Sequence, residues 1–163
     1  MKMPSARLVR RAMNLWPPFL FSGIRVLEIA DDWRYARVAL RKRWYNGNYV
    51  GTHFGGSLFA MTDPFWMIPT LRCLGPDYIV WDKAAEIEFI APGTEDVFAE
   101  FHIDDAMLDE IRAATASGEK CLRWCETEIR TASGELIARV RKHLYVRRKK
   151  GTYAAPTAPR HHA

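Results

Sequence analysis

Residues 55–74 limit what this chain can fold into, because they predict a helix that is apolar on nearly every side. A glycine pair opens the segment and a Gly-Pro pair at 75–76 ends it, as is typical of helix boundaries. Such a helix is stable in water only when other elements cover most of its surface. One carboxylate interrupts the apolar run, where Asp63 directly precedes Pro64.

The segments that can cover this helix alternate apolar and polar residues, as half-buried strands do. Four of them follow it, at residues 78–90, 96–103, 120–131 and 135–146, and two precede it, at 22–30 and 34–44. The longest alternating face consists of Ile79, Trp81, Lys83, Ala85, Ile87 and Phe89. We therefore predict an α+β fold in which an antiparallel sheet of about six strands wraps around one long central helix.

The length of 163 residues fits one domain, which we assign to residues 1–150. A short N-terminal helix is predicted, with Leu8, Ala12 and Leu15 on one face and a Trp-Pro-Pro stop after it. That stop breaks any signal-peptide core, so we expect a cytoplasmic protein. The tail at 151–163 is expected to be disordered.

Composition excludes several classes of protein. No run approaches the roughly eighteen apolar residues that span a bilayer, so no membrane association is expected. The three cysteines lack zinc-ligand spacing, so we expect neither a metal nor another cofactor. The net charge of +5 is concentrated in residues 139–150, which favours anionic partners. We do not expect nucleic acid to be one of them, because residues 135–146 alternate as a strand whose Arg139, Arg141 and His143 form a solvated face.

The string NYVGTHFGG, with an aspartate nine residues after its phenylalanine, resembles a motif of known enzymes. It is similar to the pattern of hotdog-fold acyl-CoA thioesterases of the phenylacetate-pathway and human thioesterase-superfamily-member-2 types. The segments GTHFGGSLFAMTDPF, WDKAAEIEF and LYVRRK look closer still to a tetrameric acyl-CoA thioesterase-like bacterial subgroup of undetermined function. The similarity covers roughly residues 15 to 150.

The resemblance implies a hotdog fold and a set of catalytic residues. Asn48 matches the family asparagine, Gly55 and Gly56 match the glycine pair, and Asp63 matches the aspartate that activates water or acts as nucleophile. Phe54 occupies the position of the usual histidine, and His53 lies one residue earlier.

Thioester hydrolysis needs groups that stabilise the oxyanion and a base or nucleophile. Free amides at the helix start, including that of Ser57, suit the first task, and a glycine lets a carbonyl approach closely. Asp63, expected to be buried among aromatic residues, suits the second, although an Asp-Pro pair is also a helix-start signal. Asn48 could likewise orient the substrate or simply form a turn.

Two functions stay open at this stage. The first is hydrolysis of an acyl-CoA or acyl carrier protein thioester, and the second is a non-catalytic module that binds acyl-CoA or another ligand, which Phe54 motivates. Candidate substrate-binding residues are His53, Phe54, Ser57, Lys83, Arg147 and Arg148, with Arg139 and Arg141 as further cations for the CoA phosphates.

The spacing of the catalytic residues favours self-association. In one straight helix Gly55 and Asp63 are about 12 Å apart, whereas reacting groups must approach to about 3–3.5 Å. We therefore expect the aspartate to come from a second subunit, in a homodimer or a homotetramer built from such dimers.

Overall fold

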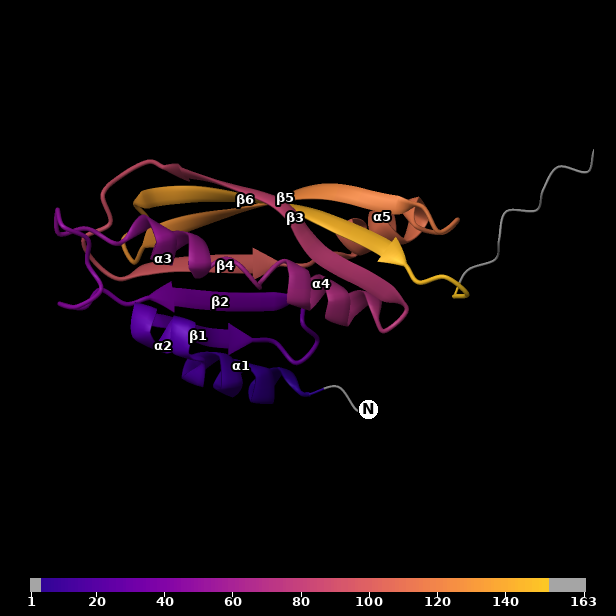
Figure 1. The fold of residues 1–163 in the computed structure, drawn as a ribbon, viewed down its shortest axis with the longest axis horizontal. Helices are drawn as coiled ribbons and strands as arrows, with labels where there is room; N and C mark the ends of the chain where they lie inside the picture. Colours follow the sequence, from indigo (N-terminus) through magenta and orange to yellow (C-terminus); the bar gives the residue numbers. More distant parts are fainter. Residues whose placement is uncertain (1–3, 153–163) are drawn as a thin grey trace, which may run out of the picture.

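The computed structural model describes residues 4–152 and has an α+β architecture (Figure 1). In chain order the elements are α1 (Ala6–Leu15), α2 (Pro17–Ser22), β1 (Ile24–Ile29), β2 (Tyr35–Leu40), α3 (Gly55–Ala60), α4 (Met67–Leu74), β3 (Tyr78–Phe89), β4 (Val97–His102), α5 (Asp105–Ala114), β5 (Lys120–Thr131) and β6 (Leu136–Arg148). The predicted tail lies outside the described residues from position 153 onward. Among the helices of residues 4–152, none is long and apolar enough to cross a bilayer.

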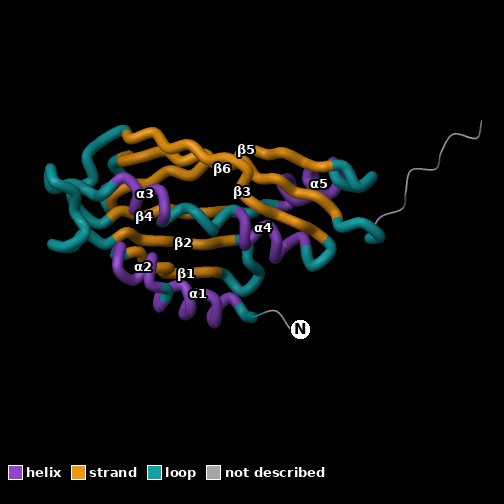
Figure 2. The backbone as a smooth tube through the Cα atoms, viewed as in Figure 1, coloured by secondary structure: helices purple, strands orange, loops and turns teal. Residues whose placement is uncertain are grey.

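The six strands form one antiparallel sheet in the order β1-β2-β4-β5-β6-β3. The helices α3 and α4 lie across one face of this sheet (Figure 2). The predicted fold class is thereby confirmed. β1 and β3 are the two edge strands, and β3 is twice as long as β1, with 12 residues against 6.

The central helical segment is two helices rather than one. Residues 61–66 form a turn between α3 and α4, in which the amides of Thr62 and Asp63 donate to carbonyl oxygens only three residues earlier. Pro64 has no N–H and disfavours helical geometry at the residue before it, so the chain cannot continue the helix here. The break leaves Asp63 at a corner between two short helices.

The core fills the space between these helices and the inner face of the sheet. Phe65, in the turn, is 1% exposed and packs on Phe101 of β4 with ring centroids 5.2 Å apart. Trp66 is buried beside it and donates from Nε1 to Thr127 Oγ1 of β5 at 2.8 Å. The two residues that follow Pro64 therefore anchor the turn to the sheet.

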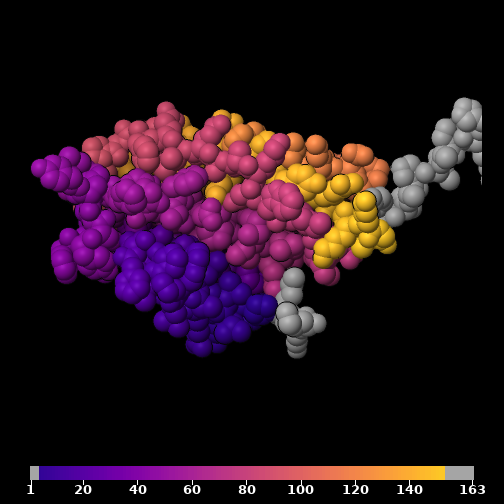
Figure 3. Space-filling view, in the orientation of Figure 1, coloured from indigo at the N-terminus to yellow at the C-terminus, as the bar shows by residue number. Residues whose placement is uncertain are grey.

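The N-terminal helices α1 and α2 pack beside β1 at one edge of the sheet (Figure 1), and the indigo surface of the N-terminal segment forms the lower part of the molecule in Figure 3. The predicted apolar face of α1 is wrong, since Leu8 and Leu15 are 57% and 73% exposed and the helix packs through Ala6, Val9 and Met13. The predicted stop is instead the start of α2, because proline is well tolerated in the first helical turn.

β3 contains a bulge at Lys83. Its pairing with β6 is regular up to Asp82 and resumes at Ala84, one residue out of step. An extra residue moves every following side chain to the opposite face of the sheet. The predicted face of alternate residues 79–89 is therefore wrong beyond Trp81.

The bulge keeps both halves of β3 in register with the core. Val80 and Asp82 face inward before it, and Ile87 pairs after it with the buried Val140. Trp81 points to the outer face, where its ring stacks on Tyr145 at 4.9 Å. Asp82 is consequently an acid on the inner, largely apolar face of the sheet.

Candidate active site

A groove of about 490 Å³ opens beside the start of α3. The loop of residues 48–53 forms one wall, and the last residue of β3 with the segment after it, residues 89–93, forms the other. Three of the predicted site residues, Asn48, His53 and Gly55, line it together. Its apolar surface comes mainly from Val50, Leu58, Phe89 and Ile90.

The start of α3 carries free backbone donors beside this groove, which Gly55 lines. The amides of Gly55 and Gly56 occupy the first two helical positions, where no oxygen of the same helix is within reach. The Ser57 amide, in contrast, donates to the carbonyl oxygen of Phe54 at 2.9 Å, so this amide already has a hydrogen-bond partner within the chain. A Cβ added to Gly55 would stand 2.8 Å from Phe89 Cζ, so the glycine keeps this corner open.

His53 is a buried, neutral histidine at the base of the groove. It is 3% exposed, and Nε2 donates to the Glu95 carbonyl oxygen at 2.7 Å, which fixes the tautomer. Its amide donates to Gly93, and among the described residues Nδ1 has no partner. Burial lowers the pKa of His53, so the imidazole stays uncharged at neutral pH.

Asn48 organises the groove wall. Its Oδ1 accepts from the amides of Val50 and Thr52 at 3.1 and 3.0 Å, and its Nδ2 donates to Thr52 Oγ1 and to the His53 carbonyl oxygen. Both side-chain N–H bonds are thereby used within the loop. This geometry supports the turn-forming role rather than direct contact with a substrate.

Phe54 and Ser57 lie outside the groove and line a separate hollow with Tyr45. Phe54 is 58% exposed and its ring covers the adjacent glycine, because a Cβ on Gly56 would meet Phe54 Cε1 at 2.4 Å. The usual histidine position thus points away from the groove, and the histidine one residue earlier points into it.

Asp63 is not among the residues that line the groove. Its Oδ1 accepts a hydrogen bond from Lys142 Nζ at 2.6 Å, and 63% of its side chain is exposed. The expected burial of this carboxylate among aromatic residues is therefore wrong for the single chain. The carboxylate faces outward from the corner between α3 and α4.

Lys142 is the residue that the sequence interpretation missed. It lies on the inner face of β6, is 2% exposed and donates to both Asp63 and Asp82, with the Asp82 Oδ2 at 2.8 Å. Burial raises the pKa of Asp82, although the Lys142 ammonium opposes the shift. The signal for Lys142 was present, because it alternates in phase with Val140 and Leu144.

The remaining candidate cations do not join the groove. Lys83 is the exposed bulge residue of β3. Arg147 donates from Nε to the Gly118 carbonyl oxygen at 2.8 Å, and Arg148 lies over the Tyr78 ring. These arginines are near the C-terminal end of β6, whereas the groove borders its other end, about 30 Å away along the strand.

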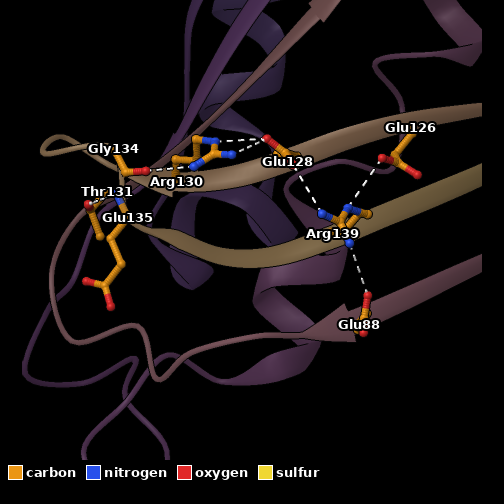
Figure 4. Close-up of polar contacts among 8 residues, drawn as sticks. All are labelled: Glu88, Glu126, Glu128, Arg130, Thr131, Gly134, Glu135 and Arg139. Carbon is orange, nitrogen blue, oxygen red and sulfur yellow. Dashed lines mark hydrogen bonds and ion pairs between the residues drawn. The ribbon is translucent and has the colours of Figure 1, made fainter.

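The basic face of β6 is largely neutralised by glutamates (Figure 4). Arg139 contacts Glu88, Glu126 and Glu128 at 3.3–3.4 Å, and Arg130 also contacts Glu128, at 2.6 Å. Arg141 pairs similarly with a glutamate of β3. The expected attraction of CoA phosphates to Arg139 and Arg141 therefore has to compete with existing ion pairs.

The geometry resembles that of several solved structures with the hotdog fold of the thioesterase superfamily. A Pseudomonas aeruginosa protein of unknown function, described as a probable thioesterase, is 19% identical over 91% of this chain and 99% of its own, with a TM-score of 0.74. The Escherichia coli PaaI protein from the phenylacetic acid degradation operon is 17% identical over 91% and 96%, with a TM-score of 0.57. Thioesterase superfamily member 2 from Mus musculus is 15% identical over 88% and 98%, with a TM-score of 0.59.

These similarities establish the hotdog fold, as the motif predicted. The chain itself belongs to the family described as Domain of unknown function (DUF4442), whose profile matches residues 5–146. No curated protein matches it by sequence. Within residues 4–152, no group of three or more His, Cys, Asp or Glu side chains forms a metal site.

Proposed function

We propose that this protein is a thioesterase that hydrolyses acyl-CoA, or an acyl carrier protein thioester, at sites shared between two subunits. The observation that carries the proposal is that the predicted site residues lie in two separate places on the chain. Gly55 and His53 meet in one apolar groove, whereas the Asp63 carboxylate lies outside it and faces outward.

The groove supplies what binding of a thioester requires. The amides of Gly55 and Gly56 can donate to the carbonyl oxygen as it becomes negative, and one such donor typically contributes about 3 kcal/mol to barrier lowering. The apolar walls formed by Leu58, Phe89 and Ile90 suit the first carbons of an acyl chain. The buried Nδ1 of His53 can accept one hydrogen bond from the substrate or from a water molecule.

The base comes from a second copy of the chain. A two-fold axis that places two antiparallel copies of the α3–α4 segment side by side brings each Asp63 to the groove of its partner. The edge strand β3 supports association on this side of the sheet, because its 12 residues have no neighbouring strand beyond them in the described chain.

Hydrolysis then follows from these positions. The Asp63 carboxylate of the partner takes a proton from water while the water oxygen bonds to the thioester carbon. The tetrahedral oxyanion is stabilised by the α3 amides, the C–S bond breaks, and the proton passes to the departing sulfur. If Asp63 attacks the carbon directly instead, a mixed anhydride forms and the CoA thiolate leaves. When ¹⁸O-labelled water then opens the anhydride at the Asp63 carboxyl carbon, a single turnover leaves ¹⁸O in the Asp63 side chain, so label in this residue identifies the nucleophilic route.

A thiol-release assay with a panel of acyl-CoAs tests the proposal. Wild type is expected to release CoA with at least one acyl chain length, and Asp63→Asn to lose at least a hundredfold in kcat while it remains folded. Asp31→Asn, at an exposed position in the β1–β2 turn, is the matched control. A substrate-free blank corrects for the half-buried Cys73 thiol.

Two outcomes contradict the proposal. Tight binding of acyl-CoA by wild type without turnover identifies the protein as a binding module, the alternative function. Full turnover by folded Asp63→Asn shows that the aspartate is only a helix-breaking corner residue.

A further inference from the structure

The side chain of Lys142 lies on the inner face of the sheet, where burial of a cation costs free energy. Lys142 lies between Ala85 of β3 and Cys125 of β5 in the sheet register, and is 2% exposed. An ammonium group in such a place persists only when carboxylates or other acceptors compensate it. Cys125 does not do so, because burial raises the pKa of its thiol to about 11 and keeps it neutral.

The compensation comes from two carboxylates in different environments. Lys142 Nζ lies 2.8 Å from Asp82 Oδ2, on a side chain that is only 22% exposed, and 2.6 Å from Asp63 Oδ1, on a side chain that is 63% exposed. The Phe59 ring, 5.2 Å from Nζ, closes a further side of the ammonium. One partner is thus enclosed with the lysine, and the other reaches solvent.

This asymmetry distinguishes the cluster from a purely structural ion pair. Asp82 is held on the inner face by the strand alternation before the bulge, so it fixes Lys142 from within the sheet. Asp63 stands at the corner between α3 and α4, where one oxygen is bonded and most of the side chain remains open. The free oxygen of Asp63 therefore has a fixed direction.

We propose that Lys142 is a positioning residue for Asp63, holding Oδ1 so that Oδ2 faces the site of the partner subunit, and that Asp82 holds Lys142 in turn. The inference rests on the proposed thioesterase function and adds to it a residue outside the recognised motif. Near-attack geometry tolerates little misplacement, so a base on a turn between two short helices needs such a restraint.

Steady-state kinetics of Lys142→Met tests the catalytic consequence. Methionine keeps the unbranched apolar stem, so the variant removes the charge with little change in packing. We expect kcat to fall at least tenfold with KM within about twofold, because the residue acts on the base and not on binding. Asp82→Asn should show a smaller fall in kcat, and Lys120→Met, at an exposed position on β5, should match wild type.

The contact between Lys142 and Asp63 is tested by NMR, independently of any enzyme activity. The ¹⁵N–¹H signal of the Lys142 ammonium, assigned through its side-chain carbons, reports its hydrogen bonds in the whole protein. We expect a slowly exchanging signal in wild type whose exchange with water accelerates several-fold in Asp63→Asn and in Asp82→Asn.

These measurements separate the failure of the two proposals. Absence of turnover in wild type overturns the thioesterase function and the catalytic part of this inference, and the NMR signal still decides whether Lys142 holds Asp63. An ammonium signal unchanged in Asp63→Asn overturns the positioning. So does a folded Lys142→Met variant with wild-type kcat, or one in which KM alone changes.

Discussion

Lys142→Met should destabilise the fold by an amount that depends on Asp82. Removal of the ammonium leaves the Asp82 carboxylate, 78% buried and already lacking a partner for Oδ1 among the described residues, without its cation. Asp63 loses little, because its exposed side chain can be hydrated. Breaking a buried pair typically costs 3–5 kcal/mol, and only one enclosed partner remains here, so we expect about 3 kcal/mol.

The double variant Lys142→Met/Asp82→Asn should recover most of that loss. It removes both charges and leaves a neutral amide, whose imperfect hydrogen bonding costs about 1 kcal/mol. The double variant should therefore be about 2 kcal/mol more stable than Lys142→Met alone, so the two substitutions are expected to be non-additive. Urea unfolding followed by tryptophan fluorescence measures this, since 3 kcal/mol corresponds to a shift in midpoint of about 1.5 M at a slope near 2 kcal/mol/M.

The pH dependence identifies the cause of the loss. Burial raises the pKa of Asp82, so between its ordinary and its folded-state pKa the native state binds more protons than the unfolded state, and stability falls as the pH rises through this window. Loss of the ammonium raises the folded-state pKa of Asp82 further and so widens this pH window. The loss of unfolding free energy in Lys142→Met, relative to wild type, should therefore be smaller at pH 4 than at pH 7. An equal deficit at both values, or additivity in the double variant, would refute this explanation.

Three further predictions concern the groove and the core. Gly55→Ala should change the unfolding free energy by less than about 1 kcal/mol in thermal melts, because the Phe89 ring that the new Cβ meets is exposed and can move. The same variant should lower kcat at least tenfold in steady-state kinetics, because the methyl group crowds the Gly55 amide. Burial lowers the pKa of His53, so the stability that this histidine contributes is present above its ordinary pKa and is lost as the pH falls through its folded-state pKa. The urea midpoint of wild type should therefore fall between pH 7 and pH 5, and this fall should be smaller in His53→Gln. Cys125, with a pKa of about 11, should resist iodoacetamide in the native protein at pH 8 and react fully in urea, as peptide mass spectrometry will report; rapid native labelling would contradict its burial.

The sequence predicted the fold well because most of its signals are local. The alternation of the strands, the turn residues between them and the apolar helical segment each specify an element without knowledge of the rest. The split between α3 and α4 was visible only as the helix-start signal of the Asp63-Pro64 pair, because Pro64 disfavours helical geometry before it but does not say how far the second helix is displaced. The apolar face of α1 was misassigned, because its apolar residues offer two overlapping faces and only packing on β1 selects one.

The candidate site was predicted in part, for a physical reason. The motif identified Gly55 and His53, which are close in sequence and share the groove. Lys142 and Asp82 were missed because their meeting depends on the register of β6 with β3, which alternation within a single strand does not give. A lysine in phase with buried residues of a strand, opposite an equally misplaced aspartate, is the pattern that would have revealed them.

Subunit complementation tests the shared site most directly. Gly55→Val fills the groove of its own chain, and Asp63→Asn removes the base that the chain supplies to its partner, so each variant alone should be inactive. Random reassembly of equal amounts makes about half of the dimers mixed, each with one intact and one doubly damaged site, and should restore about a quarter of wild-type activity. Verified mixed dimers that recover no activity would contradict the shared site, because a site formed within one chain would be damaged in every subunit.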